Sequence, residues 1–273
     1  MDKTIFYHVG TGKTGTTYLQ YRVFPKLKGI QYIQRTKFRR YPQLIAKSKS
    51  GRILLSREFD QQLEREIKAF TKHYPDTTPI IVFRRHDSYI ASQYRRFVKN
   101  GFGGSFTDFF DLDQDAGYFK QIDLNYQHQI KLLDQYFTKP PIVLIYEDMR
   151  AHPEAFFRHL ADLIGADLDL NEVNLHPKHT SYAPQQLKYM QQVGKRINMR
   201  KRRVFQNSVL HFFWKLYMGA IRYTVLFVGK QLPASRFDDQ PLIDPQELER
   251  VREAYAEDWE KVISLAKRPV FKD

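Results

Sequence analysis

The strongest constraint on the fold of this chain lies in its first residues. A continuous apolar run, Thr4–Val9, leads into a loop with glycine at positions 10, 12 and 15, and a helix-like segment follows at Thr16–Val23. A short apolar run of this kind is typical of a strand in a parallel sheet that is covered on both faces. A glycine loop between a strand and a helix directs backbone N–H groups and the positive helix end at one point, which suits a tetrahedral anion. The segment therefore predicts a phosphate-binding loop.

The side chains of this loop fit the same interpretation, because they add a cation and several hydroxyl donors. The residues expected to contact a phosphate are Gly12, Lys13, Thr14, Gly15, Thr16 and Thr17. A tight turn with two capping threonines is the alternative. The loop departs from the P-loop of NTPases, which requires glycine six positions before the lysine, where this chain has Tyr7. The chain also has no clear Walker-B aspartate, which handicaps ATP or GTP hydrolysis.

Strand-like and helix-like segments alternate up to about residue 170. Further strands are predicted at Ile53–Leu55, Ile80–Phe83 and Ile142–Tyr146, and helices at Gln61–His73, Ser88–Asn100, Tyr118–Phe137 and Pro153–Ile164. This alternation predicts an α/β fold with a doubly wound, mainly parallel sheet and a P-loop-like phosphate loop. Helical periodicity continues at Pro184–Met199, Asn207–Val228 and Pro245–Ala266. We expect a single domain over 1–273, with a nucleotide-binding core at 1–170 and a mostly helical, basic extension at 171–273.

The chain is basic, with 44 Lys and Arg against 30 Asp and Glu and a net charge of +14. Two blocks hold much of this charge: Lys3–Arg57 has 13 cations and no acid, and Val173–Phe237 has 12 cations and no acid. Such blocks favour anionic partners, which include nucleotides, nucleic acids, anionic lipids and sulfated sugars.

Cysteine is absent, which excludes a disulfide framework, a thiolate nucleophile and a Cys-based zinc site. The sequence has no close metal-binding pattern, so we expect no metal. Lys13 interrupts the first apolar run too early for a signal peptide, so we expect a cytoplasmic protein.

Four segments resemble sulfotransferases that use 3′-phosphoadenosine 5′-phosphosulfate (PAPS). Lys13-Thr14-Gly15-Thr16-Thr17 is similar to the family's 5′-phosphosulfate loop, and Arg84 with Ser92, eight residues later, is similar to its 3′-phosphate motif. An arginine at a strand end can grip a phosphate with two parallel hydrogen bonds. Tyr146–Met149 and Tyr255…Asp258-Trp259 are supporting matches.

The resemblance is greater to bacterial carbohydrate- or lipid-type enzymes than to animal cytosolic ones, whose C-terminal Arg-Lys-Gly loop is missing here. It implies PAPS as the sulfuryl donor, bound by the phosphate loop, Arg84 and Ser92. The basic segment 176–181 is a candidate to close the nucleotide site from the C-terminal side.

Two residues are candidates for the general base, and Lys13 is expected to stabilise the leaving phosphate. Glu58 follows the short strand Ile53–Leu55, in Ser56-Arg57-Glu58, and several family members carry a glutamate there. A helix-capping or surface carboxylate is the alternative. His86 follows two arginines and is the second candidate, with a plain surface histidine as its alternative.

A second basic block precedes an aromatic helix-like segment. Six cations lie between Lys195 and Arg203, and the segment that follows carries a wide apolar face. Three interpretations stay open: a helix that faces the core, an interfacial helix on anionic lipid, or an oligomer contact. The second interpretation predicts that residues 195–228 make a peripheral contact with the inner face of an anionic membrane.

The function that these observations favour is sulfuryl transfer from PAPS to a hydroxyl, or as a second choice an amine, of a carbohydrate or lipid acceptor. A P-loop-type kinase acting on a small molecule is the alternative enzyme, and its need for Mg²⁺ would distinguish it. A basic nucleic-acid-binding protein is the alternative of another class, but the sequence contains no recognised RNA- or DNA-binding motif.

Overall fold

The computed structural model describes residues 3–175, 182–197, 199, 205, 207–269. These residues form two compact units, each built from separate stretches of the chain. The first unit takes residues 1–86, 122–176 and 254–273, and the second takes 87–121 and 177–253. The expected transition from core to helical extension, near residue 170, falls close to the boundary at 176/177. The second unit, however, also contains residues 87–121, and residues 254–273 belong to the first unit.

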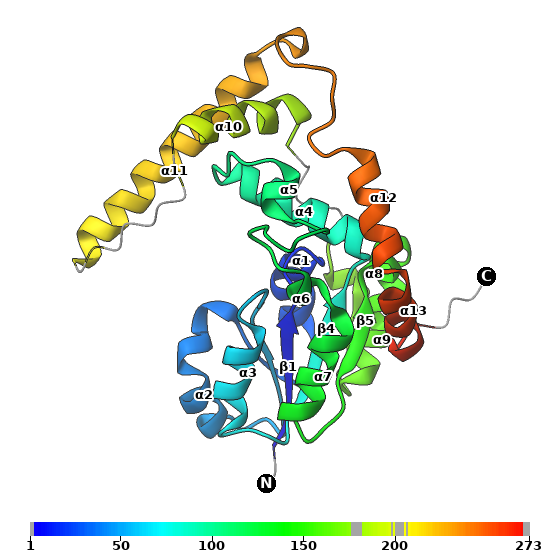
Figure 1. Ribbon diagram of the computed structural model, residues 1–273. Coiled ribbons are helices and arrows are strands. Elements are labelled where there is room, and N and C mark those ends of the chain that lie inside the picture. The colour runs from blue at the N-terminus through cyan, green and yellow to red at the C-terminus, as the bar shows by residue number, and fades with distance from the viewer. Residues whose placement is uncertain (1–2, 176–181, 198, 200–204, 206, 270–273) are drawn as a thin grey trace. The chain divides into compact units, whose positions relative to one another are not determined.

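The first unit contains a five-stranded, fully parallel sheet in the order β2-β3-β1-β4-β5 (Figure 1). The strands are β1 Thr4–Gly10, β2 Gln31–Ile33, β3 Arg52–Ser56, β4 Thr78–Phe83 and β5 Ile142–Ile145. The predicted α/β fold with a mainly parallel sheet is confirmed, and four of the five strands lie where the apolar runs predicted them. The sequence analysis missed β2, because its three residues, Gln31-Tyr32-Ile33, are too short a run to show a pattern.

Helices of the first unit cover both faces of the sheet. They are α1 Thr16–Tyr18, α2 Tyr41–Lys47, α3 Leu63–Thr71, α6 Gln121–Leu124, α7 Tyr126–Tyr136, α8 Tyr146–Ala151, α9 Pro153–Leu163 and α13 Ala256–Leu265. Short 3-10 turns lie at η2 Phe24–Lys26, η3 Arg35–Arg40 and η4 Leu170–Glu172, and α1 continues into a π-helical turn, η1 Leu19–Val23.

Alternate side chains of β1 divide the core into two layers. Phe6 packs with side chains of η1, α8 and α9 on one face, among them Leu19 and Phe157. Tyr7, the next residue, contacts Phe38 and Phe70 on the opposite face, where α3 lies. Because successive strand residues point to opposite faces, this double burial explains the continuous apolar run of β1.

The second unit contains most of α4 His86–Lys99, with α5 Phe106–Phe109, α10 Pro184–Arg196, α11 Ser208–Gln231, a 3-10 turn η5 Ala234–Arg236 and α12 Pro245–Ala254. Glycine permits a close approach here: a Cβ on Gly103 would lie 2.3 Å from the backbone nitrogen of Lys195, at the end of α10. The helix expected at Pro245–Ala266 is two helices, α12 and α13, which belong to different units. Likewise, the helix expected at Tyr118–Phe137 divides into α6 and α7, because Asn125 caps α7 through the N–H of His128.

Candidate nucleotide-binding site

The predicted phosphate loop lies at the carboxyl end of β1, the central strand. In the strand order, β1 and β4 are neighbours from which the chain proceeds toward opposite edges of the sheet. Ligands of open α/β sheets bind at such a switch point, beyond the carboxyl ends of the strands. The position of the loop is therefore the one expected for a nucleotide site.

The loop has an unusual backbone that presents Lys13 outward. Lys13 has φ 69° and Gly15 has φ 76°, both in the left-handed region, which residues other than glycine seldom adopt. The Lys13 side chain is exposed, and the buried Thr14 hydroxyl donates a 2.6 Å hydrogen bond to the carbonyl of Thr11. The loop is thus held by its own hydroxyl while its one cation faces outward.

Three of the four resembling segments meet at this edge of the sheet. Arg84, directly after β4, donates a hydrogen bond of 3.2 Å to the Lys13 carbonyl, and its guanidinium lies 4.7 Å from the ring centre of Tyr146. Gly15 faces Met149 and Tyr146 at the start of α8 so closely that a Cβ would overlap the Met149 methyl group. Segments about 60 to 130 residues apart in the chain therefore form one constellation around the phosphate loop.

The two acids after Tyr146 are engaged with neighbouring groups. The Glu147 carboxylate accepts a 3.0 Å hydrogen bond from the N–H of Arg85. Burial raises the pKa of Glu147, and the hydrogen bond from Arg85 offsets part of that rise. The buried Asp148 carboxylate pairs with Arg268, whose side chain is exposed. Among the residues that the structure describes, no group of three or more His, Asp or Glu side chains could hold a metal ion; the expectation of a metal-free site stays a prediction.

Glu58 lies beside the start of the loop. The chain beyond β3 continues along β1, because the N–H of Arg57 donates to His8 and that of Phe59 donates to Val9, both at 2.9 Å. The Glu58 side chain is only 18% exposed, and its Oε1 lies 3.9 Å from a guanidinium nitrogen of Arg35. Its buried Oε1 has no hydrogen-bond partner among the described residues. This is the same oxygen that faces Arg35, and the role of Glu58 as general base stays a prediction.

Asp60, which the sequence analysis did not select, touches the phosphate loop itself. Its Oδ1 accepts a 3.0 Å hydrogen bond from the N–H of Gly12, one of the residues predicted to contact phosphate. A Cβ on Gly12 would lie 2.9 Å from the same oxygen, so a larger residue there would push the Asp60 carboxylate away. The Gly12 N–H, which an anionic ligand would need as a donor, is thus already hydrogen-bonded to a carboxylate.

A buried polar cluster lies under the loop, on the face of the sheet that η1 covers. The Ser56 hydroxyl lies 2.8 Å from His8 Nδ1 and accepts a 3.0 Å hydrogen bond from the amide of Gln20. Burial lowers the pKa of His8 to about 3, so its ring is neutral at physiological pH. Three buried atoms, His8 Nε2, Gln20 Oε1 and the Tyr32 hydroxyl, have no hydrogen-bond partner among the described residues.

The interpretation of His86 as a surface histidine is wrong. Its side chain is 1% exposed, and its Nε2 lies 2.8 Å from Asp258 Oδ2. Its ring is stacked between those of Tyr126 and Tyr255, with centres 4.0 and 4.8 Å away. The residues that bury His86 lie 40 to 172 positions away in the chain. The sequence around His86 therefore could not indicate its burial. These contacts favour a structural role, and the catalytic role of His86 stays a prediction.

Two predicted parts of the nucleotide site, Ser92 and segment 176–181, are not placed at the phosphate loop by the contacts of the described residues. Ser92 lies half-buried on α4, in the second unit, so its pairing with Arg84 stays a prediction. Segment 176–181, the candidate to close the site, lies outside the described residues.

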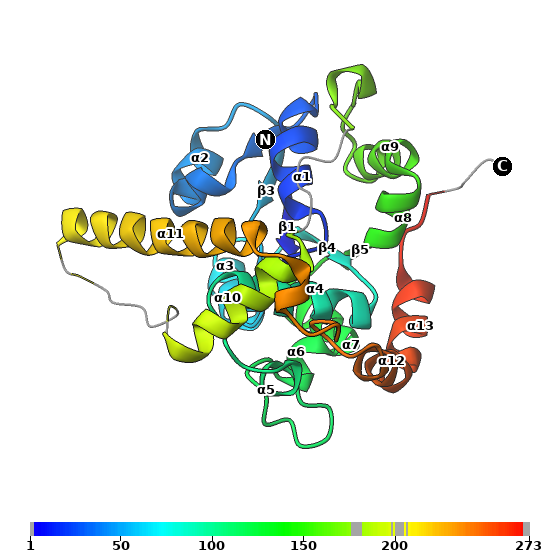
Figure 2. The ribbon, with the colours of Figure 1, turned by 90° about the horizontal axis from the view of Figure 1, so that it is seen from above.

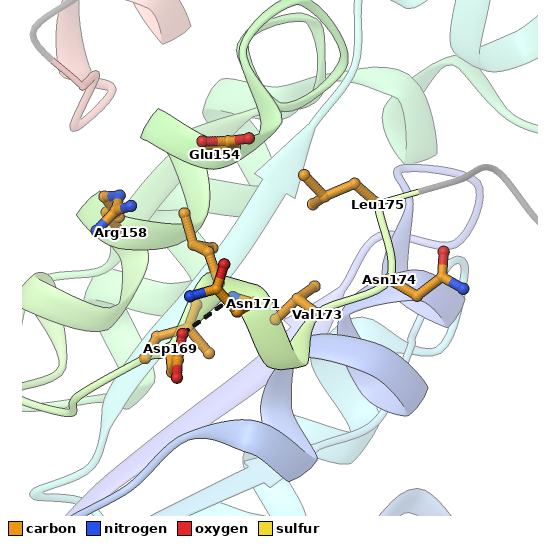
Figure 3. Close-up of a pocket in the computed structure, with 9 residues that line it drawn as sticks. Glu154, Arg158, Asp169, Asn171, Val173, Asn174 and Leu175 are labelled. Atoms are coloured by element: carbon orange, nitrogen blue, oxygen red, sulfur yellow. Dashed lines mark hydrogen bonds between the residues drawn. The ribbon is translucent and has the colours of Figure 1, made fainter.

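A cavity of about 510 Å³ in the first unit is separate from these residues (Figure 3). It lies between α9, which contributes Glu154 and Arg158, and the segment 168–175. The Asp169 side chain there accepts a 3.0 Å hydrogen bond from the N–H of Asn171. None of the residues predicted to bind a nucleotide lines this cavity.

Comparison with known proteins gives distant structural similarities. No family model and no curated protein matches the sequence. A sulfotransferase from Alicyclobacillus acidocaldarius is similar in structure at 15% identity, with a TM-score of 0.49 over 65% of this chain and 88% of that one. The mouse sulfotransferase SULT7A1, solved in complex with PAP, is similar at 12% identity, with a TM-score of 0.39 over 78% of this chain and 75% of that one. The α/β assignment therefore stands on the strand order itself.

Proposed function

We propose that this protein transfers the sulfuryl group of PAPS to a hydroxyl group, or as a second choice an amine, of a carbohydrate or lipid acceptor. The observation that carries this proposal is the meeting of the phosphate loop, Arg84 and the Tyr146–Met149 segment at one sheet edge. These are the segments whose sequences resemble PAPS-dependent enzymes. Glu58 lies beside β1, just past the end of β3, the neighbouring strand.

The residues present suit a nucleotide with two anionic groups, one at its 5′ and one at its 3′ position. The exposed ammonium of Lys13 and the guanidinium of Arg84 come from adjacent strand ends, and the loop between β1 and α1 supplies backbone N–H groups. We assign Lys13 to the 5′-phosphosulfate, and Arg84 with Ser92 to the 3′-phosphate. Asp60 opposes an anion at the N–H of Gly12, and nucleotide binding would have to displace it.

Sulfuryl transfer needs positioning, charge stabilisation and a base. The acceptor oxygen attacks sulfur while the bond between sulfur and the 5′-phosphate oxygen breaks, and its electron pair passes to the phosphate. Lys13 would stabilise the charge that develops on this phosphate. The Glu58 carboxylate would accept the proton that the acceptor hydroxyl loses.

A binding measurement tests the nucleotide assignment. Titration calorimetry of the full chain with adenosine 3′,5′-bisphosphate should show binding that persists in EDTA and exceeds that of ATP with Mg²⁺. Preference for ATP with Mg²⁺ would instead favour the kinase alternative. Salt-sensitive RNA or DNA binding without affinity for the bisphosphate would favour a nucleic-acid-binding protein.

A variant tests the chemical step. Lys13→Ala should lower kcat for transfer of labelled sulfate from PAPS by about 10²–10³, the usual loss for one transition-state donor. Lys131→Ala, which removes an exposed cation on α7, is the matched control and should retain full activity. Near-normal turnover in Lys13→Ala would refute the assignment of Lys13.

A further inference from the structure

Helix α11 in the second unit packs on α10 along one face. Its buried residues Leu226 and Gly229 lie on this face, and the Leu226 carbonyl accepts a 2.9 Å hydrogen bond from the Gln186 side chain of α10. A Cβ on Gly229 would lie 3.1 Å from the Gln186 backbone, so glycine brings the two helices close together. Figures 1 and 2 show α10 against the C-terminal half of α11, while the N-terminal half of α11 extends beyond it.

The opposite face of α11 is apolar and exposed. Eight large apolar side chains on it are 53–66% exposed: Val209, Leu210, Phe212, Phe213, Leu216, Tyr217, Tyr223 and Phe227. At 100° per residue they fall within an arc of roughly 160°. One of the three interpretations of this helix was that its apolar face packs in the core. Only the strip along α10 is buried in this way.

An apolar face of this extent on one helix marks a surface that binds something. Lys230, which is exposed, lies at one edge of this arc, and Lys215, also exposed, lies about 60° beyond the same edge. The sequence contains no acid between Val173 and Phe237, and six more cations lie between Lys195 and Arg203, directly before the helix. The face therefore belongs to a stretch of sequence whose positive charge no acid of the same stretch offsets.

We propose that α11 binds the surface of an anionic membrane, with its aromatic face in the boundary between headgroups and acyl chains and its lysines against lipid phosphates. This is how amphipathic helices with a basic flank bind bilayers. None of the described helices is long and apolar enough to cross a membrane. The proposal does not depend on sulfuryl transfer.

The charge distribution distinguishes this partner from two others. A second copy of the chain would bring the same acid-free segment against the face, so like charges would meet across the interface. A soluble acidic polymer would neutralise the lysines but would leave the aromatic side chains in water. An anionic bilayer satisfies both the charge and the apolar surface.

Vesicle co-sedimentation of the full chain tests the proposal. Binding to vesicles of phosphatidylcholine with 30% phosphatidylglycerol should be strong in about 50 mM NaCl and much weaker in about 500 mM NaCl, where screening is stronger. Pure phosphatidylcholine vesicles should bind more weakly at both salt concentrations. Quenching of Trp214 fluorescence by brominated acyl chains should report insertion of this helix.

Paired variants separate the two contributions. Phe213→Gln with Leu216→Gln should lower vesicle partitioning at least tenfold, because two exposed apolar side chains are lost. Lys215→Gln with Lys230→Gln should lower it roughly thirtyfold at low salt and little at high salt. Ile122→Gln with Leu265→Gln removes equally exposed apolar side chains from α6 and α13 and should leave partitioning unchanged.

Three results would overturn the proposal. The first is absence of binding to the anionic vesicles at low salt by a chain whose circular dichroism shows it to be folded. The second is an equal loss in the α11 pair and the α6/α13 control pair. The third is a dimer, measured by sedimentation equilibrium, that the Phe213/Leu216 pair dissociates, because the face would then bind a second copy.

Discussion

Asp258 holds His86 and the start of α7 at the same time. Its Oδ2 lies 2.8 Å from His86 Nε2, and its two oxygens accept hydrogen bonds of 2.9 and 3.0 Å from the N–H groups of Tyr126 and Gln127. Burial raises the pKa of Asp258, but these hydrogen bonds outweigh it, so the net pKa is lowered. One carboxylate on α13 thus fixes the residues that follow β4 and the N-terminus of α7.

Replacing Asp258 by alanine should therefore destabilise the first unit. Three hydrogen bonds to a buried carboxylate are lost and His86 loses its partner, so we expect a loss of about 3–5 kcal/mol in the free energy of unfolding. Asp258→Asn, which keeps the shape and one acceptor oxygen, should lose less. Urea denaturation followed by far-UV circular dichroism measures both. Equal stability of Asp258→Ala and the unmodified chain would contradict this role.

Arg84→Ala should weaken binding of adenosine 3′,5′-bisphosphate by about 10–100-fold, since one charged hydrogen-bonding partner contributes about 1.5–3 kcal/mol. Adenosine 5′-phosphosulfate lacks the 3′-phosphate and should be affected far less. Ser92→Ala should show the same selectivity with a smaller loss. Arg85→Ala, at the adjacent position, is the control, and calorimetry measures all three variants. Equal losses for both nucleotides would show that Arg84 does not contact the 3′-phosphate.

Glu58→Gln should abolish most turnover while nucleotide affinity persists. The substitution keeps the shape of the side chain and removes its ability to accept a proton, a contribution of typically about 10²–10⁴-fold in rate. Single-turnover transfer from PAPS, compared with bisphosphate affinity, separates the two effects. Unchanged turnover would exclude Glu58 and would turn attention to His86, tested as His86→Gln with its stability measured alongside.

Asp60→Asn should bind the bisphosphate about tenfold more tightly than the unmodified chain. The amide oxygen can still accept the hydrogen bond from Gly12, but the negative charge beside the incoming phosphate is gone. Asp76 is an exposed carboxylate just before β4, at the amino ends of the strands and so away from the phosphate loop. Asp76→Asn should therefore change affinity little. Weaker binding in Asp60→Asn would mean that the carboxylate shapes the loop for the nucleotide rather than competing with it.

His8 should make the protein less stable as the pH falls. Its pKa is about 3 in the folded protein and about 6.5 in an unfolded chain, so between these values only the unfolded state binds the proton. The free energy of unfolding should therefore fall by up to about 1.4 kcal/mol per pH unit as the pH drops from 6.5 toward 3. His8→Asn, which can still bond to Ser56, should flatten this slope. Parallel slopes in the two proteins, measured by urea denaturation between pH 7 and 4.5, would refute the assignment.

Much of the sheet could be predicted because burial on both faces produces continuous apolar runs that are visible in the sequence. Thr4–Gly10, Thr78–Phe83 and Ile142–Ile145 are of this kind. The phosphate loop was also visible, since its glycines and its lysine lie next to one another in the chain. Strand β2 was not, because it contributes three residues at the sheet edge and only Ile33 is fully buried.

Sequence alone determined the local features: the strand–loop–helix unit, the alternation that leads to a parallel sheet, and the excess of positive charge before an aromatic helix. Tertiary structure decided which distant groups meet. The pairing of His86 with Asp258, the contact of Asp60 with Gly12 and the stacking of Arg84 on Tyr146 join residues 48 to 172 positions apart. The orientation of α11, with its aromatic face outward, depends on where α10 packs. Hydrogen bonds, ion pairs and burial depend on distances in space, which periodicity along the chain does not encode.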